Sequence, residues 1–263
     1  MAPEVLVPSS PAEAISLFGD GAGTTVIGGG TIVVPEMSYG RLSPERVLLL
    51  SHAGLEGVTV DGDTITIGAT TPINALLGLA EHAQALADCA ANLADYEIRG
   101  QATVGGNLCA GQGTEAPRGD LQSALLALDA HVRSAGADGE STVPIEDFLS
   151  HRQGRLILDV SFQRPAASAF SALEYPHTHE YTVLAVSGVR AADGTIRLAA
   201  TGLAGTGARL RSAEAAASDI EAAGNTAASD VSFADDVLAS AWYREQTLPV
   251  LVRRVLTQLE ESA

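Results

Sequence analysis

Two glycine-rich segments contain the residues best suited to bind an anionic ligand. In each of them, residues 26–32 and 98–108, neighbouring glycines are followed at once by a small polar side chain. Glycine has no Cβ, so successive backbone N–H groups can approach an anion closely and form a concave binding site. The hydroxyl of Thr31 and the amide of Asn107 can donate further hydrogen bonds to phosphate oxygens. Two such segments fit a diphosphate better than one does, which predicts a dinucleotide cofactor.

Each segment alone has a simpler interpretation as a tight turn between strands, because isolated glycines usually mark turns. For one segment by itself, both interpretations stay open. The first segment does not follow the Rossmann pattern: Gly28 and Gly30 fit the start of G-x-G-x-x-G, but Val33 stands where the third glycine is required. Pro35 disfavours an immediate helix. A P-loop is excluded as well, because the sequence contains no lysine.

Few other side chains form a recognisable catalytic or metal-binding set. His177 and His179 would share a face of a strand, but no third metal ligand stands at a suitable spacing. Glu174 and Glu180 are either a carboxylate pair for acid–base work or part of a solvated face. No nucleophile motif is present, and two cysteines are too few for an iron–sulfur cluster. We therefore predict no catalytic side chain and no metal in this chain; a bound cofactor would carry the chemistry.

The elements that position the two segments predict an α+β fold. The expected helices are residues 11–18 (capped by Ser9 or Ser10), 71–77, 80–94, 120–128, 212–223 and 233–259, the last interrupted near Pro249. The expected strands are residues 24–27, 46–50, 58–60, 64–67, 131–133, 156–160, 181–186 and 196–201. Residues 163–168 are interpreted as a linker, and we place a domain boundary there. Strands followed by helices beyond it indicate an α+β terminal domain.

The composition is that of a globular protein with an acidic surface. Of the 263 residues, 46% are hydrophobic and 18% charged, enough for a sizeable core. A formal net charge of −17 argues against a nucleic-acid-binding protein, which needs clustered cations. No apolar run is long enough to span a membrane, and the N-terminus does not resemble a signal peptide. Cys89 and Cys109 fit a reducing cytoplasm as two buried free thiols, with a bridge between them left open.

The order and surroundings of the two segments resemble the FAD-binding medium subunit of the molybdenum hydroxylases, the family of carbon monoxide dehydrogenase and xanthine dehydrogenase. That family typically shows Ala-Gly-Gly-x-(Ser/Thr) and then Pro-x-Met, and residues 27–37 read Ile-Gly-Gly-Gly-Thr-Ile-Val-Val-Pro-Glu-Met. It then shows Ile-Arg-Asn-x-(Gly/Ala)-Thr-Ile-Gly-Gly-Asn, which residues 98–107 match with Gly100 in place of the first asparagine. The resemblance runs through the whole chain, and the pair of motifs makes it specific.

The resemblance implies three structural domains. Residues 1–57 would form a small α/β unit, and residues 58–165 a larger mixed or antiparallel sheet with helices; together they would be a PCMH-type FAD-binding domain. Residues 169–263 would form a C-terminal α+β domain like that of the carbon monoxide dehydrogenase flavoprotein, with a three-stranded antiparallel sheet and helices.

The resemblance also implies contacts with FAD. Asp120 corresponds to an acidic residue near the ribose or adenine, a role compatible with a plain helix cap. Leu156 lies where the family presents backbone groups to the adenine, although a buried strand leucine is the simpler interpretation. Tyr181 aligns with a tyrosine over the isoalloxazine ring, or is a core aromatic. Residues 109–119 depart from the family's sequence, which leaves the adenosine contacts open. The implied cofactor-binding residues are Ile27, Gly28, Gly29, Gly30, Thr31, Ile32, Ala102, Thr103, Gly105, Gly106, Asn107, Asp120, Leu156 and Tyr181.

By the same resemblance, the chain is the FAD-binding subunit of a cytoplasmic heteromeric molybdenum hydroxylase. Its partners would be a small subunit with [2Fe-2S] clusters and a large molybdopterin subunit, in a dimer of heterotrimers. Electrons would pass from the clusters through FAD to an external acceptor. One alternative is a non-catalytic nucleotide-binding or assembly subunit, which the departures at Gly100 and 109–119 keep open. The other is a stand-alone flavin oxidoreductase, for which the roughly hundred residues after the boundary are few.

Overall fold

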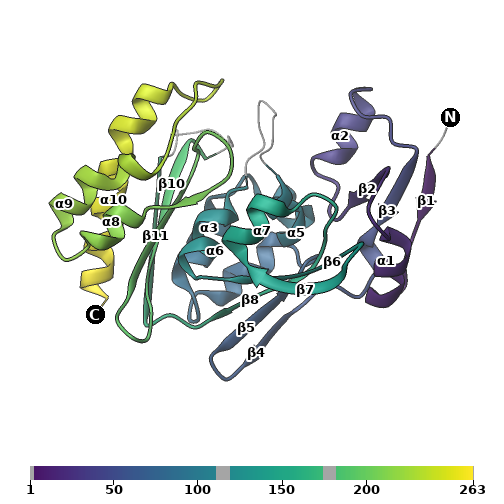
Figure 1. The fold of residues 1–263 in the computed structure, drawn as a ribbon, viewed down its shortest axis with the longest axis horizontal. Helices are drawn as coiled ribbons and strands as arrows, with labels where there is room; N and C mark the ends of the chain where they lie inside the picture. The colour runs from purple at the N-terminus through teal and green to yellow at the C-terminus, as the bar shows by residue number, and fades with distance from the viewer. Residues whose placement is uncertain (1–2, 111–118, 174–181, 263) are drawn as a thin grey trace. The chain divides into compact units, whose positions relative to one another are not determined.

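The structure is a computed structural model that describes residues 3–110, 119–173 and 182–262 (Figure 1). Helices and three sheets, two of them with antiparallel pairs, give the predicted α+β class. The chain divides into two compact units. The first consists of Met1–Ala75, Tyr96–Cys109 and His131–Phe162, and the second of Leu76–Asp95, Ala110–Ala130 and Gln163–Ala263. The predicted three-domain boundaries stay a prediction.

The first unit begins with a small parallel sheet in the order β1 (Glu4–Leu6), β3 (Arg46–Leu49) and β2 (Thr24–Ile27). Helix α1 (Pro11–Phe18) connects β1 to β2, as predicted. The Ser10 hydroxyl accepts a hydrogen bond from the Glu13 N–H at 3.2 Å and caps α1. The buried side of α1 packs with strand β3, so the predicted α/β unit around the first glycine segment is confirmed.

Helix α2 (Val33–Ser38) follows the first glycine segment, so the expectation that Pro35 disfavours a helix here was wrong. Pro35 is the third residue of α2, in its first turn. The first four N–H groups of any helix have no partner within it, so the missing N–H of proline breaks no bond there.

A five-stranded sheet forms the rest of the first unit. Its order is β4 (Val58–Asp61), β5 (Thr64–Gly68), β8 (Leu156–Gln163), β6 (His131–Gly136) and β7 (Gly139–Pro144), followed by helix α7 (Ile145–His151). The predicted hairpin of β4 and β5 is confirmed. The expected linker at 163–168 is shorter than predicted, because β8 runs to Gln163 and the next strand starts at Ala167.

The second unit is built on an antiparallel sheet that helices cover on both faces (Figure 1). Its strand order is β12 (Ala208–Arg209), β11 (Ile196–Thr201), β10 (Leu184–Arg190) and β9 (Ala167–Leu173), one short strand more than predicted. All residues of β10 but Arg190 are buried, as expected for a strand covered on both sides. The covering helices are α3 (Gln84–Asn92), α6 (Leu121–Ala127), α8 (Arg211–Ala215), α9 (Ile220–Thr226) and α10 (Ala241–Glu261).

Helix α10 differs from the helix expected over 233–259. It starts only at Ala241, because the Ser240 hydroxyl accepts from the Tyr243 N–H at 3.2 Å and caps it. It also continues through Pro249, where a break was expected. Proline removes one bond of the helical ladder, and the buried neighbours Leu248 and Leu251, which pack into the core of this unit, keep the helix together. The helix predicted over 71–77 is a 3-10 helix, Ile73–Leu79, and α3 is shorter than the helix predicted over 80–94.

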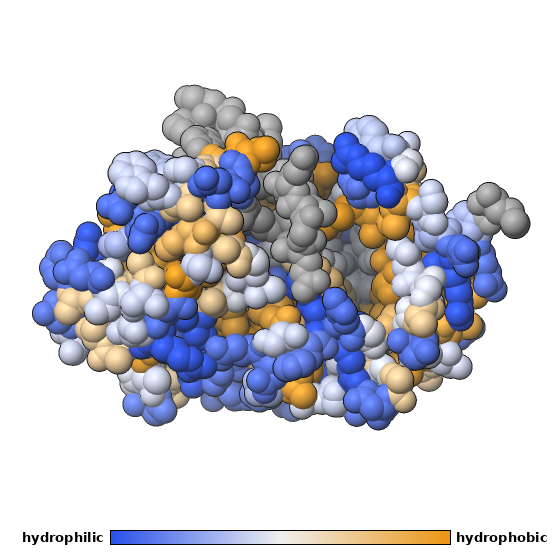
Figure 2. All heavy atoms as spheres, turned by 45° about the horizontal axis from the view of Figure 1, so that its top comes forward, coloured by the Kyte–Doolittle hydropathy of each residue, from blue (hydrophilic) through white to orange (hydrophobic). Residues whose placement is uncertain are grey.

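The surface mixes hydrophilic and apolar residues, as the face in Figure 2 shows. Large apolar side chains are exposed in α2 and α4 (Tyr96–Gln101) and at the start of α10. None of the helices in the described parts of the chain is both long and apolar enough to cross a membrane.

The two cysteines are free but differ in environment. Cys89 is buried, as predicted, and burial, aided by the negative charge of Asp120, raises the pKa of its thiol. Cys109 is exposed, so the prediction of a second buried thiol was wrong. It is the last residue of α5 (Val104–Cys109), and successive helix residues point in different directions, so its side chain lies off the face that buries Leu108.

We expect a thiol reagent such as Ellman's reagent to modify only Cys109 in the native protein, and to do so slowly, because desolvation raises the pKa of this thiol too and Arg152 offsets only part of the rise. Cys89 should react only when the chain unfolds, because its thiol is both inaccessible and held in the protonated, unreactive form. The measurement is the count of released chromophore before and after denaturation, with Cys109→Ser as the control. Two fast thiols in the native protein would contradict this assignment.

A second prediction concerns Gly188, which lets α10 approach β10. A Cβ there would stand 2.4 Å from Val255 Cγ1 and 3.0 Å from Leu198 Cδ2. Gly188→Ala should therefore lower the free energy of unfolding of the second unit by about 1–3 kcal/mol, the range for overpacking. Gly78→Ala in the same unit is the matched control, because no atom lies within 4 Å of its Cβ position. Urea unfolding monitored by circular dichroism compares the two, and equal stabilities would refute the packing argument.

Candidate cofactor site

The first glycine segment is a turn between β2 and α2. The strand ends at buried Ile27, and the chain passes through three half-buried glycines to Thr31. Gly30 has φ +76°, in the left-handed region that side chains rarely adopt. Among the described residues, no partner accepts a hydrogen bond from the backbone N–H of Gly29, Gly30 or Thr31. Three successive free donors at a glycine turn form the kind of concavity that binds an anion.

The second segment is more regular than a loop. It consists of two short helices, α4 and α5, joined at Ala102 and Thr103. Backbone hydrogen bonds fix this joint: the Ile73 N–H donates to the Ala102 carbonyl at 2.9 Å, and the Val104 N–H donates to the Thr71 carbonyl at 3.1 Å. The residues before the glycines of this segment are therefore helical, and the 71–73 stretch holds the joint between the two helices.

The glycines of α5 have different roles. The Gly105 N–H donates to the Ala69 carbonyl at 2.8 Å, and a Cβ on Gly105 would lie 3.0 Å from that oxygen. Gly105 therefore allows close packing, and its N–H is already used. The Gly106 N–H points to the Thr103 hydroxyl at 3.2 Å, a long bond. Gly106 is exposed, whereas Thr103 and Asn107 are buried.

The two segments are in direct contact. A Cβ on Gly29 would stand 1.7 Å from the Gln101 carbonyl oxygen, and a Cβ on Gly28 would stand 2.6 Å from the Thr103 hydroxyl oxygen. Real Cβ atoms do not come that close to other atoms, so any side chain at Gly29 must push the segments apart. The structure thus brings together Gly28 and Gly29 of the first segment with Gln101, Ala102 and Thr103 of the second.

The outcome for the remaining predicted residues is mixed. Leu156 is buried in the core of the first unit with Phe18, consistent with the simpler structural interpretation, and its backbone role stays a prediction. Tyr181, His177 and His179 lie outside the described residues.

Asp120 belongs to the second unit, where it is buried immediately before α6. Its side chain makes no capping hydrogen bond, contrary to expectation, because its backbone is already helical (φ −58°, ψ −39°) instead of extended. The Asp120 carbonyl oxygen accepts from the Cys89 thiol at 3.3 Å.

One residue of this region was missed from the sequence. Arg152, at the end of α7, is buried and donates from Nη1 to the Leu108 carbonyl at 2.5 Å, which holds the end of α5. Burial lowers the pKa of its guanidinium. A single arginine after a helix gives no sequence signal, so only the fold reveals it.

The arrangement fits an anionic cofactor and offers no acid–base machinery. Free backbone N–H groups, a buried hydroxyl and a surface without side chains suit phosphate oxygens, which need donors at close range. Within the described stretches, no group of three or more His, Cys, Asp or Glu side chains could hold a metal ion. The cradle at the contact of the two segments therefore meets the requirement of a diphosphate.

Comparison with known proteins agrees with this geometry. Residues 2–162 match the family described as "FAD binding domain in molybdopterin dehydrogenase". The chain is 27% identical to the 6-hydroxypseudooxynicotine dehydrogenase complex subunit alpha of Paenarthrobacter nicotinovorans, over 97% of this chain and 93% of that protein. It is 30% identical to the carbon monoxide dehydrogenase medium chain of Hydrogenophaga pseudoflava, over 56% of this chain and 51% of that one.

Solved structures share the fold along the whole chain. A chain of carbon monoxide dehydrogenase from Hydrogenophaga pseudoflava, in a form lacking the Mo-pyranopterin moiety of its cofactor, superposes with a TM-score of 0.88 at 25% identity. The superposition covers 100% of this chain and 99% of that chain.

Gly29→Ala tests the contact between the segments. The added methyl cannot coexist with the Gln101 carbonyl oxygen, so the segments must separate and the free N–H groups lose their arrangement. We expect FAD affinity to fall at least about a hundredfold, as expected when two to three charge-assisted hydrogen bonds are lost. The measurement is the flavin content after purification and the Kd for added FAD.

Gly100→Ala in α4 is the matched control, because its Cβ would meet only Asn74 Nδ2, at an ordinary 3.5 Å. It should bind FAD like the unmodified chain and be more stable by about 0.5–1 kcal/mol, since alanine favours a helix. Normal FAD binding by Gly29→Ala would show that the contact does not organise the site.

Proposed function

The chain belongs to the family of FAD-binding domains of molybdopterin dehydrogenases, and from this premise we propose that the two glycine segments hold the diphosphate of its FAD. The chain is a FAD-binding subunit of an oxidoreductase of the molybdenum hydroxylase type. The single observation that supports the diphosphate assignment is the row of free N–H groups at Gly29, Gly30 and Thr31, next to the contact with Gln101.

Each residue of the cradle has a distinct part in this proposal. The N–H groups of Gly29 and Gly30 donate to one phosphate, and the Thr31 hydroxyl adds a donor beside them. The Thr103 hydroxyl lies beside Gly28, and its oxygen accepts from the Gly106 N–H. Its own proton would therefore be donated to a phosphate oxygen at the joint of the segments. Arg152 holds the end of α5 and so keeps the second segment in place. Asp120, Leu156 and Tyr181 remain proposed contacts of the nucleoside and the ring.

The wider role follows from the relatives, which are named as subunits or chains of dehydrogenases. Bound FAD would supply two-electron and one-electron transfer. We propose that this chain takes electrons from a [2Fe-2S] partner subunit, which receives them from a molybdopterin subunit, and delivers them to an external acceptor. A dimer of heterotrimers in the cytoplasm, and the domain boundaries at 57 and 165–169, belong to the same proposal.

The proposal is tested on the chain co-expressed and purified with its partner subunits. We expect heat to release FAD, not FMN, in about one equivalent per chain, as a diphosphate cradle requires. We also expect the visible flavin absorption to bleach when the complex meets its substrate without an acceptor, and to return on adding one. The complex with Gly29→Ala is the control and should neither carry the band nor reduce the acceptor.

Two outcomes would contradict parts of the proposal. A complex that assembles but binds no flavin would favour the non-catalytic assembly subunit. A flavin that is released as FAD but never bleaches with substrate would leave the binding site intact and remove the electron-transfer role.

A further inference from the structure

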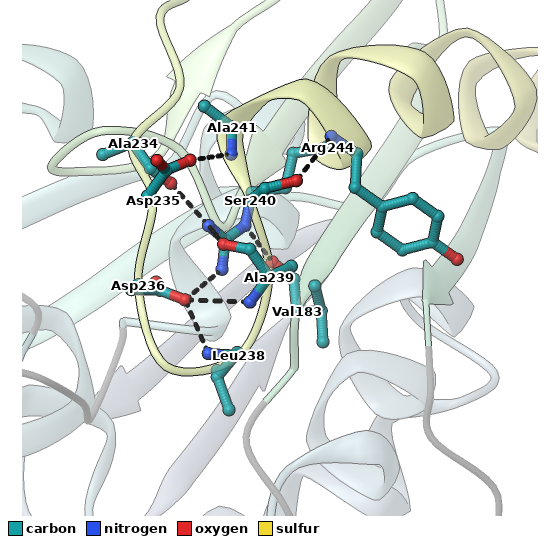
Figure 3. Close-up of polar contacts among 10 residues, drawn as sticks. Val183, Ala234, Asp235, Asp236, Leu238, Ala239, Ser240, Ala241 and Arg244 are labelled. Carbon is teal, nitrogen blue, oxygen red and sulfur yellow. Dashed lines mark hydrogen bonds and ion pairs between the residues drawn. The ribbon is translucent and has the colours of Figure 1, made fainter.

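Helix α10 is preceded by a loop, residues 234–240, whose shape is fixed by a buried arginine (Figure 3). Arg244 is fully buried. Its Nε donates to the Val183 carbonyl at 3.1 Å, and its Nη1 donates to the carbonyls of Ala234 at 2.6 Å and Ala239 at 2.9 Å. Its Nη2 donates to Asp236 Oδ1 at 2.7 Å. One guanidinium thus joins both ends of the loop to the sheet and compensates its own buried charge.

The loop also has its own internal bonds, drawn in Figure 3. Asp236 Oδ1 accepts from the N–H groups of Leu238 at 2.9 Å and Ala239 at 3.2 Å. Asp235 Oδ1 accepts from the Ala241 N–H at 2.6 Å, at the first residue of α10. A loop that is ordered before it meets a partner loses little conformational entropy on binding.

This rigid support presents apolar side chains to solvent. Val237, in the loop, is 76% exposed, and Trp242, in the first turn of α10, is 67% exposed. Tyr243 is 41% and Val250 39% exposed. Trp242 and Val250 are eight residues apart, so they lie on one side of the helix, while the opposite side is buried in the core. We call these four residues the loop–helix surface. Tryptophan and tyrosine on a pre-ordered support are typical of the centre of a protein interface.

The charge of this region indicates what kind of protein would bind. Between Ala234 and Val250 the charged residues are Asp235, Asp236, Glu245 and Arg244, and the arginine is buried and paired with Asp236. Asp235 and Glu245 are exposed, and the whole chain has a formal net charge of −17. A second copy would bring the same acidic residues to the contact, and like charges disfavour such a pair.

We propose that the loop–helix surface docks a different subunit of the complex, through an apolar pocket that receives Trp242 and a basic rim that faces Asp235 and Glu245. The inference rests on the proposed function, since it takes the chain to be one subunit of a heteromeric oxidoreductase. It assigns the contact to residues of the second unit that are not among the proposed cofactor-binding residues.

The test uses the chain's single tryptophan. The chain is labelled with 5-hydroxytryptophan, which is excited separately from the tryptophans of other subunits, and is compared free and in the complex purified from cells. On assembly we expect iodide quenching of the label to fall at least about threefold, because interface centres exclude water. Quenching that is unchanged in the complex overturns the proposal, and so does a chain that purifies alone or pairs with itself through this surface.

Matched variants separate docking from folding. Val237→Asp should weaken the complex at least about tenfold, as the loss of an interface hot spot does. Val60→Asp, at a valine of β4 that is 42% exposed, should leave it unchanged. Glu245→Arg should slow association by about tenfold if the rim of the partner is basic. Equal assembly of Val237→Asp and Val60→Asp at equal Tm would overturn the docking surface.

Flavin content is read on the same samples and keeps the two claims apart. A flavin-free complex that protects Trp242 retains the docking surface and removes the cofactor role. A flavin-containing complex in which Trp242 stays accessible retains the cofactor role and removes the docking surface.

Discussion

The contact of Gly29 with the carbonyl oxygen of Gln101 is the constraint on which the candidate site depends. A Cβ on Gly29 would stand 1.7 Å from this oxygen, although the two residues are more than seventy positions apart in the chain. Only a hydrogen fits between the two backbones. The end of α4 can therefore lie beside the end of β2 only because residue 29 is glycine. Moving either backbone would also separate Gly28 from the Thr103 hydroxyl.

The two segments meet in this way because the second one is held by the sheet rather than by its own sequence. The backbone hydrogen bonds from Ile73, Val104 and Gly105 tie the joint of α4 and α5 to the stretch that leaves β5. That leaves few donors of the second segment for a ligand, and the first segment supplies the free ones. The proposed diphosphate cradle thus consists of one segment with free donors and a second, rigid segment beside it, an arrangement that suits pre-organised electrostatic binding.

Local patterns in the sequence predicted those parts of the fold that local interactions determine. The Ser10 cap, the hairpin around Gly62, and the strands at Thr24 and Ile196 all follow from adjacent residues. The failures at the two prolines have different causes. Helix α10 runs through Pro249 because its buried face packs into the core, whereas α2 accommodates Pro35 because proline loses no bond in the first turn of a helix. We predicted that the two segments act together because both could bind phosphate. Their contact joins residues far apart in the sequence, so local patterns do not reveal it.

The charge of the chain explains why the cradle is built from backbone. A protein with a formal net charge of −17 and no lysine has little positive surface to attract an anionic cofactor. Backbone N–H groups carry no net charge and bind at contact distance, where their partial charges are not screened, whereas repulsion from distant carboxylates falls off over a Debye length of about 8 Å. Two arginines with strong structural ties, Arg152 and Arg244, are used to fix carbonyls. In the proposed site, close packing at glycine therefore does what a basic side chain does in many phosphate sites, and the backbone geometry at Gly29 would matter more for binding than the charge of any residue around it.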